Sequence, residues 1–337
     1  MARLWTDVID PQTLTGYTRR SLAEYEADKG SLARWLPNRE IAEMSARFMV
    51  GGSGLVEEAR YRSFDAEPEF GKQPEGKRVT VDLPPLSQQG IISERDQLRL
   101  RSADNDIRTR ILADATRYAV RAVADRSERQ RGTVLVTGQA NIAQDNYADT
   151  ADFGRDPSMS VTAGTLWNAG GDVLADLEAW YDHYVDVNGV APGSLVTSTR
   201  VARILAANDS FAVQLVNGAS RPAGLNDVNT VLAGLGLPPI TIYDRRTSNG
   251  RIIPDDRLLL LPAAVDPNGE SELGATFWGQ TLASSEPEWN IAPSEQPGIV
   301  AAAFTHEGIP PIRHTFVDSL TLPVGANMNL SFVAKVL

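Results

Sequence analysis

The fold is decided by residues 102–131, which read SADNDIRTRILADATRYAVRAVADRSERQR and contain neither glycine nor proline. Apolar side chains recur there every three or four residues, at Ile107, Ile111, Ala115, Ala119 and Ala122. That spacing places them along one face of a helix. Ser102 is a suitable N-cap, and Gly132 is a suitable stop. The stretch therefore predicts a single helix roughly 40 Å long, at about 1.5 Å per residue.

The charged side chains of this helix alternate in sign. Arginines stand at Arg108, Arg110, Arg117, Arg121, Arg126 and Arg129. Acidic residues lie between them, at Asp106, Asp114, Asp125 and Glu128. Because opposite charges three or four positions apart pair on a helix surface, the pattern favours a solvated helix face over a nucleic-acid contact.

The composition is that of a globular protein. The chain has 337 residues, of which 42% are hydrophobic and 22% charged, enough for a substantial core and about two domains. It has no cysteine, which excludes disulfides and thiolate sites. The net charge of -11 argues against tight wrapping of nucleic acid. No apolar run is long enough to cross a membrane, and the N-terminus has no signal-peptide core, so we expect the chain to remain in the cytoplasm where it is made.

Two extensions precede the central helix. Residues 1–48 carry apolar side chains too thinly for a core, so we expect an arm that docks on something else. Residues 51–54 are the flexible break GGSG, and two alternating segments then flank a charged tip at 66–76. This pattern predicts a long, exposed β-hairpin that ends at Pro84-Pro85.

A mixed segment follows the central helix. Residues 132–138, GTVLVTG, are a candidate buried strand, and 166–187 contain a second amphipathic helix. Strands at 194–197 and 240–243 alternate with helices at 199–207 and 225–235. Further strands are predicted at 251–253, 257–261, 312–317, 319–323 and 329–336. The sequence therefore predicts an α+β protein.

No motif for catalysis or for a cofactor is present. There is no phosphate-binding loop, and Gly52-Ser53-Gly54 lacks the final glycine of a nucleophile elbow. The three histidines, at 183, 306 and 314, have no metal-site spacing. His183, near Asp182 on a helix, could act alone as an acid or base, but a surface histidine is the simpler interpretation. We therefore expect no catalytic residue, cofactor or metal.

The lysines suggest a second role for the hairpin. Only four occur, and Lys72 and Lys77 both lie at the predicted tip. A solvated tip alone would explain them. Alternatively, they pair with carboxylates of a neighbouring subunit.

The order of these elements resembles the tailed-phage major capsid protein with the Hong Kong 97-type fold. The stretch at 132–138 after the helix is similar to a strand of the lambda-type capsid family. Residues 167–184, followed by PGSLVTS at 192–198, resemble that family's axial lobe, and NLSFVAKV at 329–336 resembles its closing strand. The resemblance covers nearly the whole chain but contains no invariant short motif.

The resemblance implies a division of the chain. Residues 1–48 would be the N-terminal arm and 49–100 the extended loop. Residues 101–160 and 286–337 would form the peripheral domain, with the spine helix at 102–131. Residues 161–285 would form the axial domain.

It also implies a function. The chain would be a structural protein of the virion and not an enzyme, assembling in the host cytoplasm into hexamers and pentamers around double-stranded DNA that it does not bind specifically. A separate scaffolding protein, a portal and a decoration protein would be its partners. Contacts between subunits are expected at Lys72, Lys77, Glu67, Glu69, Trp35, Arg245 and Arg246.

Two alternatives stay open. An encapsulin-type nanocompartment shell has the same fold and would differ in particle size and lumen content. An α/β hydrolase-like enzyme built on residues 167–243 is of a different class, and it would need a cleft that brings Asp182 and His183 to a serine.

Overall fold

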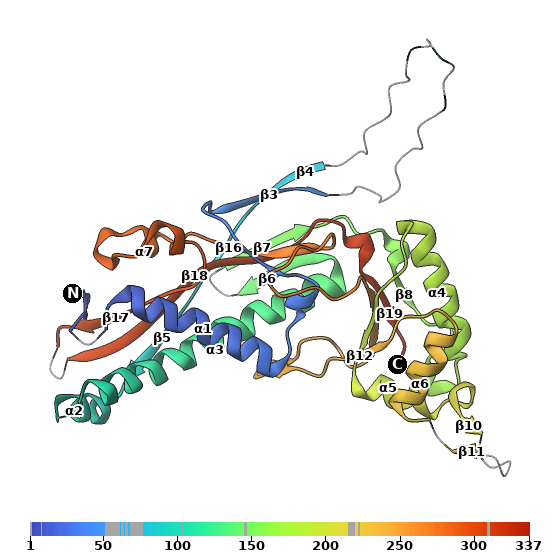
Figure 1. Ribbon diagram of the computed structural model, residues 1–337, viewed down its shortest axis with the longest axis horizontal. Coiled ribbons are helices and arrows are strands. Elements are labelled where there is room, and N and C mark those ends of the chain that lie inside the picture. The colour runs from blue at the N-terminus through green and yellow to red at the C-terminus, as the bar shows by residue number, and fades with distance from the viewer. Residues whose placement is uncertain are drawn as a thin grey trace.

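The computed structural model describes residues 2–7, 9–50, 61, 64, 67, 77–102, 104–144, 147–214, 220–221, 223–308 and 311–337. Figure 1 shows an elongated molecule, in which a body of sheet and long helices continues into a helix-covered lobe. The N-terminus lies at the far end of the body and the C-terminus lies in the lobe. The hairpin of β3 (Ser45–Val50) and β4 (Lys77–Asp82) lies on the outside of the body, above it in Figure 1.

The central helix is longer than predicted. A separate helix, α2, takes Glu94–Ser102, and α3 then runs over Asn105–Thr137 and ends at Gly138, whose φ is 75°. The strand predicted at 132–138 is therefore wrong. Val134 and Leu135 are completely buried. The packing of these side chains outweighs the weak helix propensity of the β-branched residues in this stretch, so the helix continues. Arg155 donates to the carbonyl oxygens of Leu135 and Val136 at 3.1 and 2.7 Å, which caps the helix end.

The body is built on a mostly antiparallel sheet. Its strands, in spatial order, are β1 (Ala2–Leu4), β17 (Val300–His306), β18 (Ile312–Gly325), β16 (Gly274–Gly279) and β2 (Asn38–Glu40). Strand β5 (Pro85–Ile92) also pairs with β18. The 14 residues of β18 pair with β17 and β5 in their first part and with β16 in their second. Helices α3 and α1 (Pro11–Lys29) pack on this sheet.

The predicted N-terminal arm is largely part of this body. Helix α1 packs on α3 and β17, and β1 and β2 complete the sheet. The expectation that residues 1–48 dock elsewhere is wrong for these elements. Leu14 and Leu22 supply the apolar contacts, but Thr15 and Thr18 are equally buried and complete the contact face. Apolar periodicity alone does not predict this helix, because Thr15, Thr18, Ser21 and Glu26 are buried on it beside the apolar residues.

The lobe contains a second sheet, in the order β12 (Ile240–Ile242), β9 (Ser194–Thr197), β15 (Arg257–Leu261), β19 (Phe332–Lys335) and β8 (Ser160–Thr162). Helices α4 (Val173–Asn188), α5 (Thr199–Ala207) and α6 (Leu225–Gly234) surround it, as predicted. Two strands belong to a different sheet than the predicted division implies. Strand β16, expected in the axial domain, pairs in the sheet of the body, and β19, expected in the peripheral domain, pairs in the sheet of the lobe. A local pattern predicts that a strand exists but not which strand it pairs with.

Smaller elements complete the chain. The other hairpins are β6 (Gln139–Gln144) with β7 (Tyr147–Asp152), β10 (Val213–Gln214) with β11 (Ser220–Arg221), and β13 (Arg246–Thr247) with β14 (Gly250–Arg251). Helix α7 spans Leu282–Ser285. Short 3-10 turns lie at Leu32–Arg34, Pro157–Met159, Trp167–Ala169, Asp209–Phe211, Pro287–Trp289, Pro293–Glu295 and Met328–Leu330.

A β-hairpin lies in this part of the chain, but only its second strand is where the sequence predicts one; the first strand, β3, precedes the GGSG break at 51–54 instead of following it. Its strands pair from Ser45 with Asp82 to Val50 with Lys77. Ala46 and Val81 are buried against the body, which fixes the base of the hairpin. The predicted charged tip at 66–76 lies outside the described residues, apart from Glu67. Among the described helices, none is long and apolar enough to cross a membrane.

Candidate functional site

A cluster of buried charges joins the elements of the body. Glu128 and Arg131 of α3 are both fully buried and lie one helical turn apart. Arg131 Nη1 donates to Glu128 Oε2 at 2.8 Å and to Glu26 Oε1 of α1 at 2.6 Å. Its Nε donates to Thr276 Oγ1 of β16 at 2.9 Å. One guanidinium therefore fixes two helices and a central strand.

The same cluster reaches the lobe. Tyr243, directly after β12, donates its hydroxyl to Glu128 Oε1 at 2.6 Å. Arg245 pairs with Asp125 at 3.0 Å and donates to the carbonyl oxygen of Gly30 at 2.9 Å. The segment after β12 is thereby bound to α3 and to the end of α1.

The buried charges remain ionised. Desolvation acts to raise the pKa of Glu128, but the charges of Arg131 and Arg245 outweigh it and hold this pKa below its usual range. Desolvation acts to lower the pKa of Arg131, but the two glutamates raise it above the ordinary value. Burial raises the pKa of Tyr243. Because its groups are closed off from solvent and bonded to one another, the cluster suits joining elements and not proton transfer to a substrate.

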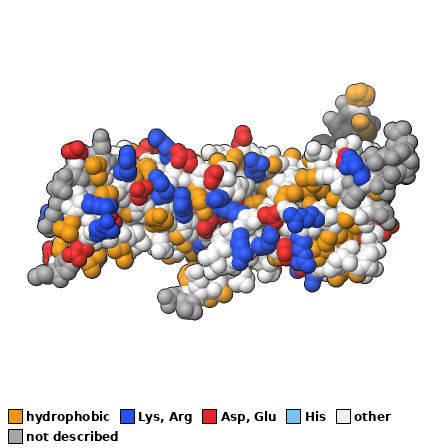
Figure 2. Space-filling model, turned by 90° about the horizontal axis from the view of Figure 1, so that it is seen from below, with side chains coloured by type: hydrophobic (Ala, Val, Ile, Leu, Met, Phe, Trp, Pro, Cys, Tyr) orange, Lys and Arg blue, Asp and Glu red, His pale blue; other side chains and the backbone are white. Residues whose placement is uncertain are grey.

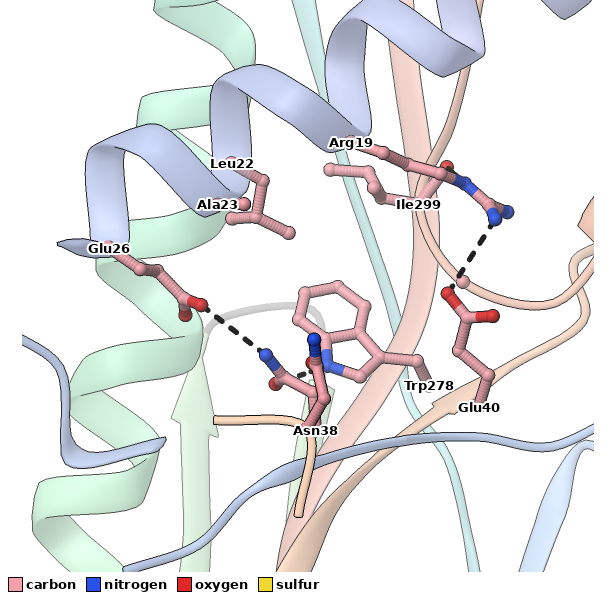
Figure 3. Close-up of a pocket in the computed structure, with 10 residues that line it drawn as sticks. Arg19, Leu22, Ala23, Glu26, Asn38, Glu40, Trp278 and Ile299 are labelled. Carbon is pink, nitrogen blue, oxygen red and sulfur yellow. Dashed lines mark hydrogen bonds and ion pairs between the residues drawn. The ribbon is translucent and has the colours of Figure 1, made fainter. Parts of the chain in front are cut away.

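A cavity of about 430 Å³ lies beside this cluster (Figure 3). Trp278, Leu22 and Ile299 form apolar walls. Asn38 accepts from the Trp278 indole at 2.8 Å and donates to Glu26. Arg19 approaches Glu40 at 3.6 Å at the opposite side. These polar groups already bind protein partners, so the cavity presents no nucleophile and base aimed at each other.

The hydrolase alternative has one supporting contact. His183 of α4 and Ser158 lie 3.1 Å apart, joined by a hydrogen bond. A triad also needs a carboxylate that orients the histidine. No such bond to His183 occurs among the described residues, and Asp156, the nearest acid in sequence to Ser158, instead accepts from the Ser158 backbone at 2.8 Å. The described chain also contains no group of three or more potential metal ligands.

The predicted contact residues fall into three sets. Trp35 and Arg245 are only 2% and 8% exposed and bind within their own chain, which corrects the expectation that they face a neighbour. Glu67 and Arg246 are exposed. Lys72, Glu69 and the side chain of Lys77 lie outside the described residues.

Sequence reasoning missed the charge cluster, although a signal existed. Glu128 and Arg131 continue the buried face that Val120, Ala124 and Ser127 define at helical spacing. A charged residue in such a stripe must find a buried partner. The pattern could have identified these two residues but not Glu26, Tyr243 or Arg245, which come from distant segments.

Large apolar side chains are exposed over several elements. They include Met44, Met49, Ile91, Leu98, Ile107, Tyr118, Leu282 and Ile312, together with Tyr61 and Phe64 between β3 and β4. Figure 2 shows hydrophobic side chains between mixed basic and acidic ones along the lower face. Scattered exposed apolar side chains are common on folded proteins, so the group that bears on function is the one gathered around the β3–β4 hairpin: Met44, Met49, Tyr61 and Phe64.

Comparison with known proteins gives a consistent family. A family model described as phage major capsid protein E matches residues 37–276. A structure assigned as the capsid protein of an E. coli CFT073 prophage is 15% identical, with 100% of both chains covered and a TM-score of 0.59. A phage-related protein from Bordetella bronchiseptica RB50 is 13% identical, with 98% of both chains covered and a TM-score of 0.58.

A looser likeness extends to an encapsulin complex from Synechococcus elongatus PCC 7942. It is 12% identical over 91% of this chain and 86% of that one, with a TM-score of 0.46. None of the curated protein sequences compared with the chain matches it. The predicted Hong Kong 97-like α+β fold is confirmed by the first two structures.

Proposed function

The chain belongs to the phage major capsid protein E family, and we propose that it builds an icosahedral phage head from hexamers and pentamers of itself. Its role as a major capsid protein, a structural component of the phage head, follows from the family. The sequence-based prediction of a tailed-phage capsid protein is thereby confirmed. The closed shell, and its assembly from hexamers and pentamers, are what we propose.

The observation that carries the proposal is the projecting β3–β4 hairpin. Met44, directly before β3, and Met49 of β3 are 69% and 54% exposed, and Tyr61 and Phe64 between the strands are fully exposed. Surface of this kind is stabilised when a partner covers it. A shell of identical copies offers such a partner at every position.

The same proposal assigns parts of the chain. Of the predicted extended loop at 49–100, the part up to the end of β4 at Asp82 is the segment that reaches a neighbour, whereas β5 pairs with β18 in the body. Helix α3 is the spine helix of the peripheral domain. The lobe around β9, β12 and β15 is the axial domain that meets its copies at symmetry axes. Glu67, Glu69, Lys72, Lys77 and Arg246 are the proposed contacts of the extended loop and lobe.

The remaining partners follow from the same role. A separate scaffolding protein would guide closure, a portal would occupy one vertex, and a decoration protein could bind the outer surface. The shell would enclose double-stranded DNA without specific binding, which agrees with the net charge of -11. Assembly would take place in the host cytoplasm, and the protein would act by assembly instead of catalysis.

Negative-stain electron microscopy of the purified chain, with and without crowding agents, tests the proposal. We expect closed particles or their hexameric and pentameric building blocks. A protein that sediments as a monomer at every concentration would contradict it.

A further inference from the structure

Strand β5 forms an open edge of the sheet in the body. It pairs with β18 from Pro85 to Ile92, and no other described strand pairs with it. Its 8 residues make it the longest edge strand in the described part of the chain, whereas the sheet's other two edges, β1 and β2, have 3 residues each. Edge strands of natural proteins are usually short, charged or covered, because an open edge pairs readily with another chain.

The hydrogen bonds of β5 show which of its backbone groups face outward. The carbonyl oxygen of Leu86 accepts from Ser319 Oγ of β18 at 2.8 Å, so it points toward β18. Backbone groups of successive residues in an antiparallel strand point to opposite sides. The N–H and C=O groups of Ser87, Gln89 and Ile91 therefore point away from β18, and no described residue bonds to them.

This edge is exposed and held in place. Gln88 and Gln89 are exposed, and Ile91 is 76% exposed. Gly90 lies so close to α3 that an added Cβ would be 2.6 Å from the carbonyl oxygen of Ala115. Because β18 fixes one side of β5 and α3 fixes one face, the free edge is already in the geometry that a further strand requires.

We infer that the free edge of β5 pairs with the β5 edge of a second copy, antiparallel and about a twofold axis at Gln89. The outward-facing residues at 87, 89 and 91 are spaced symmetrically about this position. Ser87 would lie opposite the partner's Ile91, and Gln89 opposite the partner's Gln89. Since each such pair exchanges two bonds, the contact supplies about six backbone hydrogen bonds.

The side chains favour a second copy over a different partner. A charged residue at the centre of a twofold pair faces its own like charge, which destabilises the pair. Strand β5 reads PLSQQGII and has no charge along its whole length, whereas β2 bears Arg39 and Glu40 and β1 bears Arg3. The side chain of Gln89 can both donate to and accept from its own copy.

The choice of this occupant rests on the proposed function. An icosahedral shell has twofold axes between neighbouring clusters, and a contact that is complementary to itself belongs on such an axis.

Cross-linking tests the axis directly, because the chain has no cysteine of its own. In the variant Gln89→Cys, the two thiols would lie opposite each other, with Cα atoms about 5.5 Å apart, within reach of a disulfide. Gln88→Cys is the matched control: this position is also exposed, but it lies opposite the partner's Gly90. Mild oxidation of the full chain, before and after assembly, should link Gln89→Cys into dimers about tenfold faster than Gln88→Cys. Equal rates would overturn the inference.

Charge substitution distinguishes a second copy from any other strand. Gln89→Lys and Gln89→Glu each place like charges at the axis, and each should raise the concentration needed for particle formation about threefold. An equal mixture of the two variants should restore assembly, because opposite charges then meet. Gln88→Lys is the control and should assemble as the wild type does. Impaired assembly that the mixture does not restore would overturn pairing about a twofold axis.

The β5 pair and the proposed function fail separately. Normal particles in which Gln89→Cys links no faster than Gln88→Cys would overturn the pair and leave the proposed function intact. Linked dimers of Gln89→Cys in a protein that forms no particles would support the pair and overturn the proposed function.

Discussion

Glu128 and Arg131 are charges that the fold has taken completely out of water. Such a pair contributes little net stability compared with apolar residues, because desolvation offsets the attraction. Removing one partner is different, since it leaves the other charge buried and unpaired. The cluster is therefore better understood as a device that fixes how α1, α3 and the segment after β12 meet.

Arg131→Met should lower the free energy of unfolding by about 3–5 kcal/mol, because Glu26 and Glu128 lose their shared cation. Urea unfolding followed by circular dichroism would measure it. Arg117→Gln is the control: Arg117 pairs with Asp114 at the same spacing on the same helix, but in solvent, and should cost less than about 1 kcal/mol. Similar losses for the two variants would contradict the buried network.

His314 predicts a dependence of stability on pH. Desolvation, and then the charge of His306, whose ring stacks on it at 4.9 Å, lower the pKa of His314 below its ordinary 6.5. The unfolded chain therefore binds more protons than the folded one just below pH 6.5, so stability must fall as pH drops through that range.

His314→Gln should weaken this dependence. Urea unfolding at pH 7.5 and 5.5 should show a smaller loss on acidification for the variant than for the wild type. An equal loss in both proteins would exclude His314 as the cause.

At the level of single residues, the buried charge cluster around Glu128 and Arg131 was not predicted from the sequence. The helical stripe could have marked Glu128 and Arg131 as buried. Their partners could not be predicted, because Glu26 lies 105 positions from Arg131 and only the tertiary fold brings them together. Trp35 and Arg245 were expected at subunit contacts, and the same long-range packing places them inside.

Helix α3 shows how burial overrides local preference at the level of elements. Gly132 and the run TVLVT favour a helix stop followed by a strand. The helix instead continues, because Val134 and Leu135 enter the main core and Gly132 allows close approach to Ile252. The true stop is Gly138, where the left-handed backbone conformation favours glycine.

Gly138→Ala should therefore destabilise the protein by about 1–2 kcal/mol, since a Cβ would be strained at this φ and would lie 2.9 Å from Arg155 Cβ. Gly164→Ala is the control, because no atom lies within 4 Å of its added Cβ and its φ is ordinary. Differential scanning calorimetry of both variants would measure the effect. Equal melting temperatures would mean that α3 ends elsewhere.

A change in the segment between β3 and β4 can test assembly without disturbing the folding of the subunit. Replacing residues 51–76 by a short Gly-Ser turn keeps the paired strands and their anchors Ala46 and Val81. The variant should melt cooperatively near the wild-type temperature but form no closed particles. Normal particles by electron microscopy would show that the extended loop is dispensable for closure.

The elements themselves were largely predictable, and their partners were not. Helices α4, α5 and α6 follow apolar periodicity, and β4 follows its alternation, but β3 lies before the GGSG break instead of after it. Helix α1 was missed because threonines form part of its contact face. The sides taken by β16 and β19 were missed because pairing depends on residues far apart in sequence.

For the whole molecule, the charge cluster joins the sheet and helices of the body to the segment after β12 in the lobe. The projecting hairpin and the exposed apolar side chains are what the subunit leaves uncovered. A subunit that leaves apolar side chains uncovered around one hairpin fits a shell in which neighbouring copies cover them.

Cryo-electron microscopy of particles formed by the full chain tests this most directly. The account predicts a closed shell of fivefold and sixfold clusters, in which each β3–β4 hairpin lies on a neighbouring copy and covers the exposed methionines and aromatics. Particles in which each hairpin contacts only its own subunit, or a protein that remains a solitary folded monomer, would contradict it.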